Sequence, residues 1–136
     1  MQTNSNDWQA APRLARGYNQ VGELLLKVGD ATTALDHFRR ALAVVEQARS
    51  QGSTRHPTLR QLALSYFHIG QTYAAMAASA PTRQRPQHWR DVRHAYQRSL
   101  DLFLELCQKG ALLPEQADKP EQITRAIARC DATLAK

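Results

Sequence analysis

The chain has 136 residues and a mass of 15.3 kDa, a size that suits one domain. Hydrophobic residues make up 43% and charged residues 22%, close to the averages for globular proteins, so the composition excludes wholesale disorder, a collagen-like chain and a disulfide-dense scaffold. The net charge is +6 and the pI about 9.8, and most of the basic residues are arginine.

The sequence gives no sign of membrane insertion or export. Its apolar runs are at most six residues long, whereas a membrane-spanning helix needs roughly 20. The first seven residues lack the basic flank and apolar stretch of a secretory signal. Cys107 and Cys130 form no CxxC pair, which favours free thiols that pack as small apolar residues in a reducing compartment. We therefore expect a cytoplasmic protein without membrane contact.

Apolar residues recur every three or four positions, which predicts a chain that is essentially all helix. Residues 1–11 are polar and are expected to form a mobile tail. The first helix is predicted over 12–28, with one apolar face made of Leu14, Tyr18, Val21, Leu25 and Val28. Gly29 ends it, and Asp30 is placed to cap a second helix that runs to about residue 51. These two helices should form a tight antiparallel hairpin.

Three further helices follow. Pro57 suits the first turn of a third helix that extends to about residue 78. Residues 79–86 form a loop by composition, and a fourth helix is predicted over 87–109. Residues 110–119 are irregular, with a short turn at Pro114, and a last helix is expected over 120–135.

The chain contains an internal repeat. Residues 18–22 match residues 66–70 at an offset of 48, and residues 38–42 match residues 96–100 at an offset of 58. The larger second offset corresponds to an insertion at 79–86. The sequence therefore predicts two helical hairpins, repeat one over 12–52 and repeat two over 57–110, followed by one more helix.

These positions resemble the tetratricopeptide repeat (TPR) family. Repeat one supplies the family's residues at Tyr18, Val21, Gly22, Leu25, Gly29, Ala34, Phe38 and Ala41. Repeat two supplies Tyr66, Ile69, Gly70, Tyr73 and Tyr96, but Val92 and Ser99 replace small residues, so it is degenerate. The chain also resembles the carboxyl-terminal repeats of some large bacterial regulators, including serine/threonine kinases. The resemblance implies an all-α, right-handed superhelical stack in which the helix at 120–135 caps the second hairpin.

No motif points to catalysis. The chain lacks a GxSxG nucleophile turn, a GxxxxGK[ST] phosphate loop and an HExxH zinc helix. His88 and His94 are six residues apart, which on a helix separates them by about 120° and does not suit a shared metal. We therefore predict that the protein is not an enzyme and holds neither a metal nor another cofactor.

The resemblance implies a partner-binding groove on the first helix of each hairpin. Its positions fall on Arg16, Asn19, Glu23, Leu26 and Lys27 in repeat one, and on Leu64, Phe67, Gln71, Ala74 and Ala75 in repeat two. Some members of the family clamp a terminal carboxylate with lysine and asparagine, but this chain has Asn19 and Glu23 there, and Glu23 would repel a carboxylate. The expected function is a noncatalytic scaffold or adaptor that binds a peptide or protein.

Two alternatives for these groove residues remain open at this point. The polar set also fits ordinary exposed helix surface. Leu26, Leu64 and Phe67 also fit packing against the last helix or against a second subunit.

A cluster of arginines suggests an alternative function, the binding of RNA or another anion. Five arginines and a single aspartate lie between residues 83 and 98. The candidate patch consists of Arg83, Arg85, Trp89, Arg90 and Arg93. Because no known nucleic-acid-binding motif accompanies it, a solvated helix face is favoured over a nucleic-acid partner.

Helical repeat arrays usually need three or more repeats and polar caps. The sequence supplies two repeats and one candidate cap, so it leaves two interpretations open. The chain either forms a homodimer or belongs to a longer array.

Overall fold

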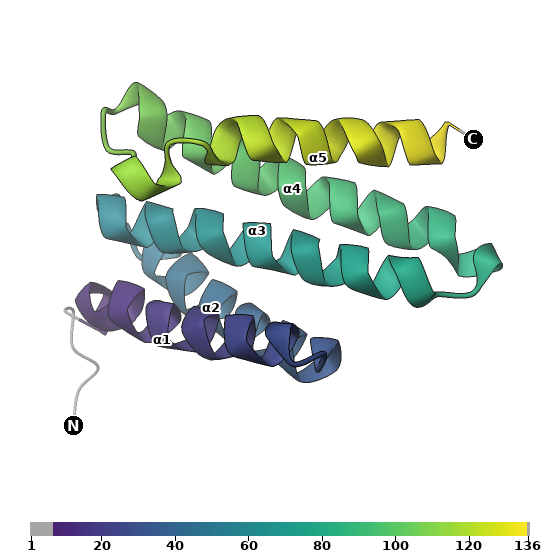
Figure 1. Ribbon diagram of the computed structural model, residues 1–136. Coiled ribbons are helices and arrows are strands. Elements are labelled where there is room, and N and C mark those ends of the chain that lie inside the picture. Colours follow the sequence, from purple (N-terminus) through teal and green to yellow (C-terminus); the bar gives the residue numbers. More distant parts are fainter. Residues whose placement is uncertain (1–6, 136) are drawn as a thin grey trace.

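The computed structural model describes residues 7–135 and is built from helices (Figure 1). The five α-helices are α1 (Asp7–Lys27), α2 (Ala31–Ser50), α3 (His56–Ser79), α4 (Arg85–Gln108) and α5 (Lys119–Leu134). Two short 3-10 helices, η1 (Thr82–Gln84) and η2 (Pro114–Gln116), precede α4 and α5. No strand occurs between residues 7 and 135, which confirms the all-helical prediction. None of the described helices is long and apolar enough to cross a bilayer.

Helix α1 begins earlier than the sequence indicated. It starts at Asp7, so residues 7–11 are helical and not a tail, while residues 1–6 of the predicted tail lie outside the described residues. The prediction began the helix at Pro12, and proline is common in the first turn of a helix. Proline inside a helix removes one backbone hydrogen bond, and α1 accommodates Pro12 in its interior.

The predicted loop at 79–86 is also shorter than expected. Helix α3 continues to Ser79, η1 occupies 82–84, and α4 begins at Arg85. Pro86 lies in the first turn of α4, where its missing N–H costs nothing. Its ring therefore marks the start of a helix, whereas the composition of the segment indicated a loop.

The helices follow one another across the molecule, with α1 at one edge and α5 at the other (Figure 1). Helix α1 packs on α2, and α3 contacts α1, α2 and α4. Helix α5 packs along α4. Because α5 lies at the edge, its Ile123, Ile127 and Cys130 are buried against the core while its other face meets solvent.

Each hairpin is closed by a glycine against an aromatic ring. A Cβ atom added at Gly22 would lie 2.5 Å from Cε1 of Phe38, and one at Gly70 would lie 2.8 Å from Cδ1 of Tyr96. Both distances are too short for a side chain, so only glycine lets the two helices approach this closely. The same contact occurs at matching positions of the two repeats, α1 with α2 and α3 with α4.

The predicted turn between α1 and α2 is confirmed. Gly29 has a φ of 91°, a backbone conformation that side chains disfavour, and it follows the end of α1. The Asp30 carboxylate then accepts a hydrogen bond from the backbone N–H of Thr33 at 3.1 Å. This bond satisfies one of the free amides at the start of α2.

The apolar face predicted for the first helix was only partly correct. Leu14, Val21 and Val28 are 52%, 44% and 78% exposed, whereas Tyr18 and Leu25 are half-buried. The inward face of α1 instead carries Ala11, Ala15, Asn19 and Gly22. Small residues bring this helix close to its neighbours, so the larger apolar side chains are turned outward.

The two cysteines differ in their environment. Cys130 is 1% exposed, as predicted, and burial raises the pKa of its thiol. Cys107 was expected in the core, but it is exposed. It lies next to the buried Leu106, one position past the inward face of α4.

Candidate binding groove

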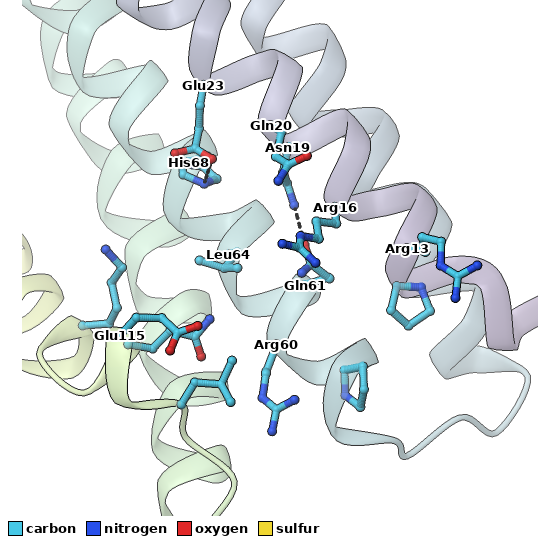
Figure 2. A pocket seen from close by; sticks show the side chains of 15 residues that line it. Arg13, Arg16, Asn19, Gln20, Glu23, Arg60, Gln61, Leu64, His68 and Glu115 are labelled. Atoms are coloured by element: carbon cyan, nitrogen blue, oxygen red, sulfur yellow. Dashed lines mark hydrogen bonds and ion pairs between the residues drawn. The ribbon is translucent and has the colours of Figure 1, made fainter.

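An open groove with a volume of about 520 Å³ runs over α3. Its sides are formed by α1 and by the segment that leads through η2 into α5, and α3 supplies its floor (Figure 2). We call this feature the groove. Its lining residues are Pro12, Arg13, Arg16, Asn19, Gln20, Glu23, Pro57, Arg60, Gln61, Leu64, His68, Leu113, Glu115, Gln116 and Lys119.

Asn19 joins α1 to α3 at the centre of the groove. Its side chain is 3% exposed and donates hydrogen bonds to Oε1 of Gln61 at 3.1 Å and to Oγ of Ser65 at 3.2 Å. A buried amide without such partners would destabilise the fold, and these bonds satisfy it. Asn19 therefore fixes the spacing of the two helices that frame the groove.

His68 and Glu23 face each other farther along the groove (Figure 2). Nε2 of His68 lies 3.7 Å from Oε1 of Glu23, and the imidazole stacks on Phe38 with 4.9 Å between ring centroids. Burial lowers the pKa of His68, and the Glu23 carboxylate opposes this shift. A lowered pKa keeps the imidazole neutral at pH 7, so His68 does not supply a cationic partner for Glu23.

The opposite end of the groove is electropositive. Arg13 and Arg16 are exposed and form no ion pair among the described residues. The guanidinium of Arg60 donates through Nε and Nη2 to the carbonyl of Ala111 at 3.1 and 2.9 Å, so no carboxylate neutralises it. Three guanidinium groups therefore lie at this end of the groove, and none of them forms an ion pair with a carboxylate among the described residues.

The segment at 113–119 adds three polar side chains to the groove, one of which is the exposed carboxylate of Glu115. Lys119 lies with its ammonium 4.5 Å from the centre of the Phe67 ring, a cation–π contact. Gln116 is 6% exposed, and its Oε1 atom has no hydrogen-bond partner among the described residues. Buried side-chain oxygens are normally paired, so this acceptor is an exception on the wall of the groove.

The structure brings only part of the predicted groove together. Arg16, Asn19, Glu23 and Leu64 line it. Leu26, Lys27, Phe67, Gln71, Ala74 and Ala75 do not line it. Leu26 is half-buried against a second apolar cluster around Phe38.

Phe67 was expected on the groove surface, and this was wrong. It is 4% exposed, with its ring 6.0 Å from that of Tyr96 and beneath the ammonium of Lys119. The groove assignment treated this position as open, whereas the start of α5 covers it, in line with the alternative of packing against the last helix. Gln71 hydrogen-bonds Nδ1 of His68 at 3.2 Å and therefore supports the groove from behind.

Sequence reasoning missed Arg13, His68, Arg60, Gln61 and the wall at 113–119. Arg60 and Gln61 lie one turn before Leu64, so the helical spacing of three and four residues could have identified both. The wall at 113–119 had no such signal, because an irregular segment reveals nothing about its path.

The arginine patch predicted for anion binding is partly engaged within the protein. Nε of Arg85 donates to the carbonyl of Ala80 at 2.9 Å, and Nε of Arg93 donates to Asp131 at 2.5 Å. Arg90 donates to Gln87 at 3.1 Å, and Arg83 is exposed. Trp89 is half-buried against the core, which reduces the ring surface that could stack on a base.

Neither a protein-family model, nor a curated protein, nor a solved structure matches the chain. The described residues contain no group of three or more histidine, cysteine, aspartate or glutamate side chains that could hold a metal ion. The interpretation of the groove therefore rests on its own geometry and charge.

Replacing Asn19 with alanine is expected to lower the free energy of unfolding by about 1 kcal/mol. The lost hydrogen bonds outweigh the higher helix propensity of alanine, since Ser65 remains buried. Urea denaturation measures the change. Combining Asn19→Ala with Ser65→Ala should cost less than the sum of the two single changes, and additive costs would show that the two side chains are not coupled.

Proposed function

We propose that the chain is a noncatalytic protein-interaction module of TPR type, whose groove binds an extended acidic segment of a partner protein. The observation that carries the proposal is an open groove with three guanidinium groups, none of them paired with a carboxylate in residues 7–135. Unpaired arginines at a concave surface suit carboxylate recognition, because guanidinium groups form short bidentate hydrogen bonds with carboxylates.

The internal symmetry of the fold supports the family part of the proposal. The Gly22–Phe38 and Gly70–Tyr96 contacts recur in two consecutive hairpins, and α5 follows as a single helix along α4. The groove lies on α1 and α3, the first helices of the two hairpins. These are the helices on which the TPR resemblance expects a partner to bind, within a right-handed superhelical stack.

The distribution of charge orients the ligand. The Glu23 end disfavours a carboxylate, so the acidic side chains belong next to Arg13, Arg16 and Arg60. Leu64 and Leu113 offer apolar contact between the two ends. The proposed ligand is therefore an extended segment that combines clustered acids with at least one apolar residue, and it differs from a terminal carboxylate held in the family's clamp.

Selection from a library of displayed random peptides tests this function. Peptides retained by the wild-type chain are expected to be enriched in aspartate and glutamate. The double variant Arg13→Gln, Arg16→Gln should bind the selected peptides about tenfold more weakly or worse, because a lost charge-assisted hydrogen bond contributes about 1.5–3 kcal/mol. Fluorescence anisotropy measures the affinities.

Arg129→Gln is a suitable control for the charge change. Arg129 is exposed on α5 and does not line the groove. This variant should bind the selected peptides like the wild type. Peptides without acidic enrichment, or equal losses for the groove and control variants, would contradict the proposal.

The cellular setting and the alternative ligand of the arginine patch are also proposals. A cytoplasmic setting is supported by the two free thiols, whereas a bacterial source is proposed on the TPR resemblance alone. RNA or anion binding by the arginine patch stays a prediction; the internal contacts of Arg85 and Arg93 make it the weaker alternative.

A further inference from the structure

Exposed apolar side chains are concentrated on α1. Among the described residues, five large hydrophobic side chains are strongly exposed, and four of them lie on α1 or directly after it. They are Leu14 at 52%, Val21 at 44%, Leu24 at 63% and Val28 at 78%. Such a concentration on one element of a small protein marks an interaction surface.

The spacing of these residues forms one continuous stripe. Positions 14, 17, 21, 24 and 28 alternate steps of three and four residues, the pattern by which one helix packs along another. Gly17 occupies the second position, and a Cβ atom added there would have no neighbour within 4 Å. The stripe therefore has a hollow at Gly17 and its most exposed side chain at Val28.

We propose that the stripe is the interface of an antiparallel homodimer, in which α1 of one copy packs against α1 of a second copy about a two-fold axis. A two-fold axis brings the same surface of both copies together, so the surface must complement itself. In the antiparallel orientation, Val28 of each copy faces the hollow at Gly17 of the other. Leu24 of each copy then packs near Val21 of the other.

The two ends of the stripe carry opposite charges. Arg13 borders the stripe near its start and Asp30 follows its last residue, whereas Arg16 and Glu23 line the groove on another side of α1. An antiparallel pair places Arg13 of one copy toward Asp30 of the other. A parallel pair would place Arg13 beside its own copy and the Gly17 hollow opposite itself.

The outward face of α5 argues against head-to-tail stacking, in which α1 of one copy would pack on α5 of the next. The outward face of α5 is polar, with an ion pair between Arg125 and Glu121, and Arg129 is exposed there. Seating the apolar stripe of one copy on this face would remove these charges from water without new partners. The apolar stripe on α1 therefore complements the same stripe of a second copy, and it does not complement the polar face of α5.

Light scattering on the full chain tests the dimer over dilutions from millimolar to micromolar concentration. The expected mass at high concentration is twice 15.3 kDa, with dissociation on dilution. The double variant Val21→Glu, Leu24→Glu should weaken association about a hundredfold or more, since it places carboxylates together in an apolar seam. Circular dichroism should show unchanged helicity, because both side chains are exposed in the monomer.

Leu104→Glu is the matched control, since Leu104 is 43% exposed on α4 and lies outside the stripe. This variant should associate like the wild type. A wild-type chain that stays monomeric at every concentration would overturn the proposal, as would a dimer that persists unchanged in the stripe variant.

Disulfide cross-linking tests the orientation. In a Cys107→Ser background, which removes the exposed native thiol, one chain carries Gly17→Cys and a second carries Val28→Cys. Under mild oxidation the mixture should form the mixed dimer in preference to either self-linked dimer. Preferential self-linking of each chain would overturn the antiparallel arrangement. The stripe variant leaves Arg13, Arg16 and Arg60 intact, so loss of the dimer and loss of peptide binding are separable results.

Discussion

Replacing Phe38 with alanine is expected to lower the free energy of unfolding by about 3–5 kcal/mol, the largest effect of any single substitution considered. Phe38 has no exposed surface and lies between Gly22 of α1 and the imidazole of His68 on α3. Truncation removes the ring that fills the space left by a glycine, so no nearby side chain can close the cavity. Urea denaturation with circular dichroism measures the loss.

The Phe38→Ala substitution should also change the groove. His68 stacks on the Phe38 ring and meets Glu23, so the cavity would free the imidazole at the groove wall. Leu104→Ala is the control, since it removes a large side chain that is already 43% exposed, and its effect should stay within about 0.5 kcal/mol. Equal losses at the two positions would contradict the assignment of Phe38 as the centre of the first hairpin.

The fold was largely predictable because its signals are local. The spacing of apolar residues located all five helices, and Gly29 with Asp30 located the first turn. The two glycine–aromatic pairs were visible as an internal repeat before their contact was known. Helix ends were less predictable, since Pro12 and Pro86 can begin a helix or be tolerated near its start.

The apolar pattern of α1 alone did not predict which of its faces packs against the neighbouring helices. The helix has two faces that could pack, one of large apolar residues and one of small residues with Asn19. Hydrophobicity favoured the first, but the close approach demanded by Gly22 selects the second. The result places Asn19 in a buried network and leaves the stripe from Leu14 to Val28 outside.

The groove was predictable to the extent that it lies on regular helices. Arg16, Asn19, Glu23 and Leu64 were located by the resemblance to the TPR family, which implies a groove on the first helix of each hairpin. The wall at 113–119 depends on how an irregular segment returns across α3, which no local pattern encodes. That return also buries Phe67 beneath Lys119, which explains why the residue is in the core.

Gly22→Ala is expected to destabilise the fold by about 2 kcal/mol, although alanine has the higher helix propensity. The added methyl group would lie 2.5–2.9 Å from three carbons of the Phe38 ring, and this ring is fully buried and cannot swing away. Gly17→Ala is the matched control on the same helix. In a single copy no atom lies within 4 Å of its new methyl group, so at a concentration at which the chain is monomeric it should stabilise the helix by about 0.5–1 kcal/mol.

A double-mutant cycle then separates the clash from every other effect of the new methyl group. In a Phe38→Ala chain the ring is absent, so adding Gly22→Ala should cost nothing further or restore some stability, because the methyl group enters the cavity. All four chains are compared by urea denaturation at one protein concentration. If Gly22→Ala costs the same with and without the ring, the close approach of α1 and α2 does not depend on this contact. The equivalent cycle at Gly70 and Tyr96 should give the same sign, since the second hairpin is closed by the same contact at matching positions of the repeat.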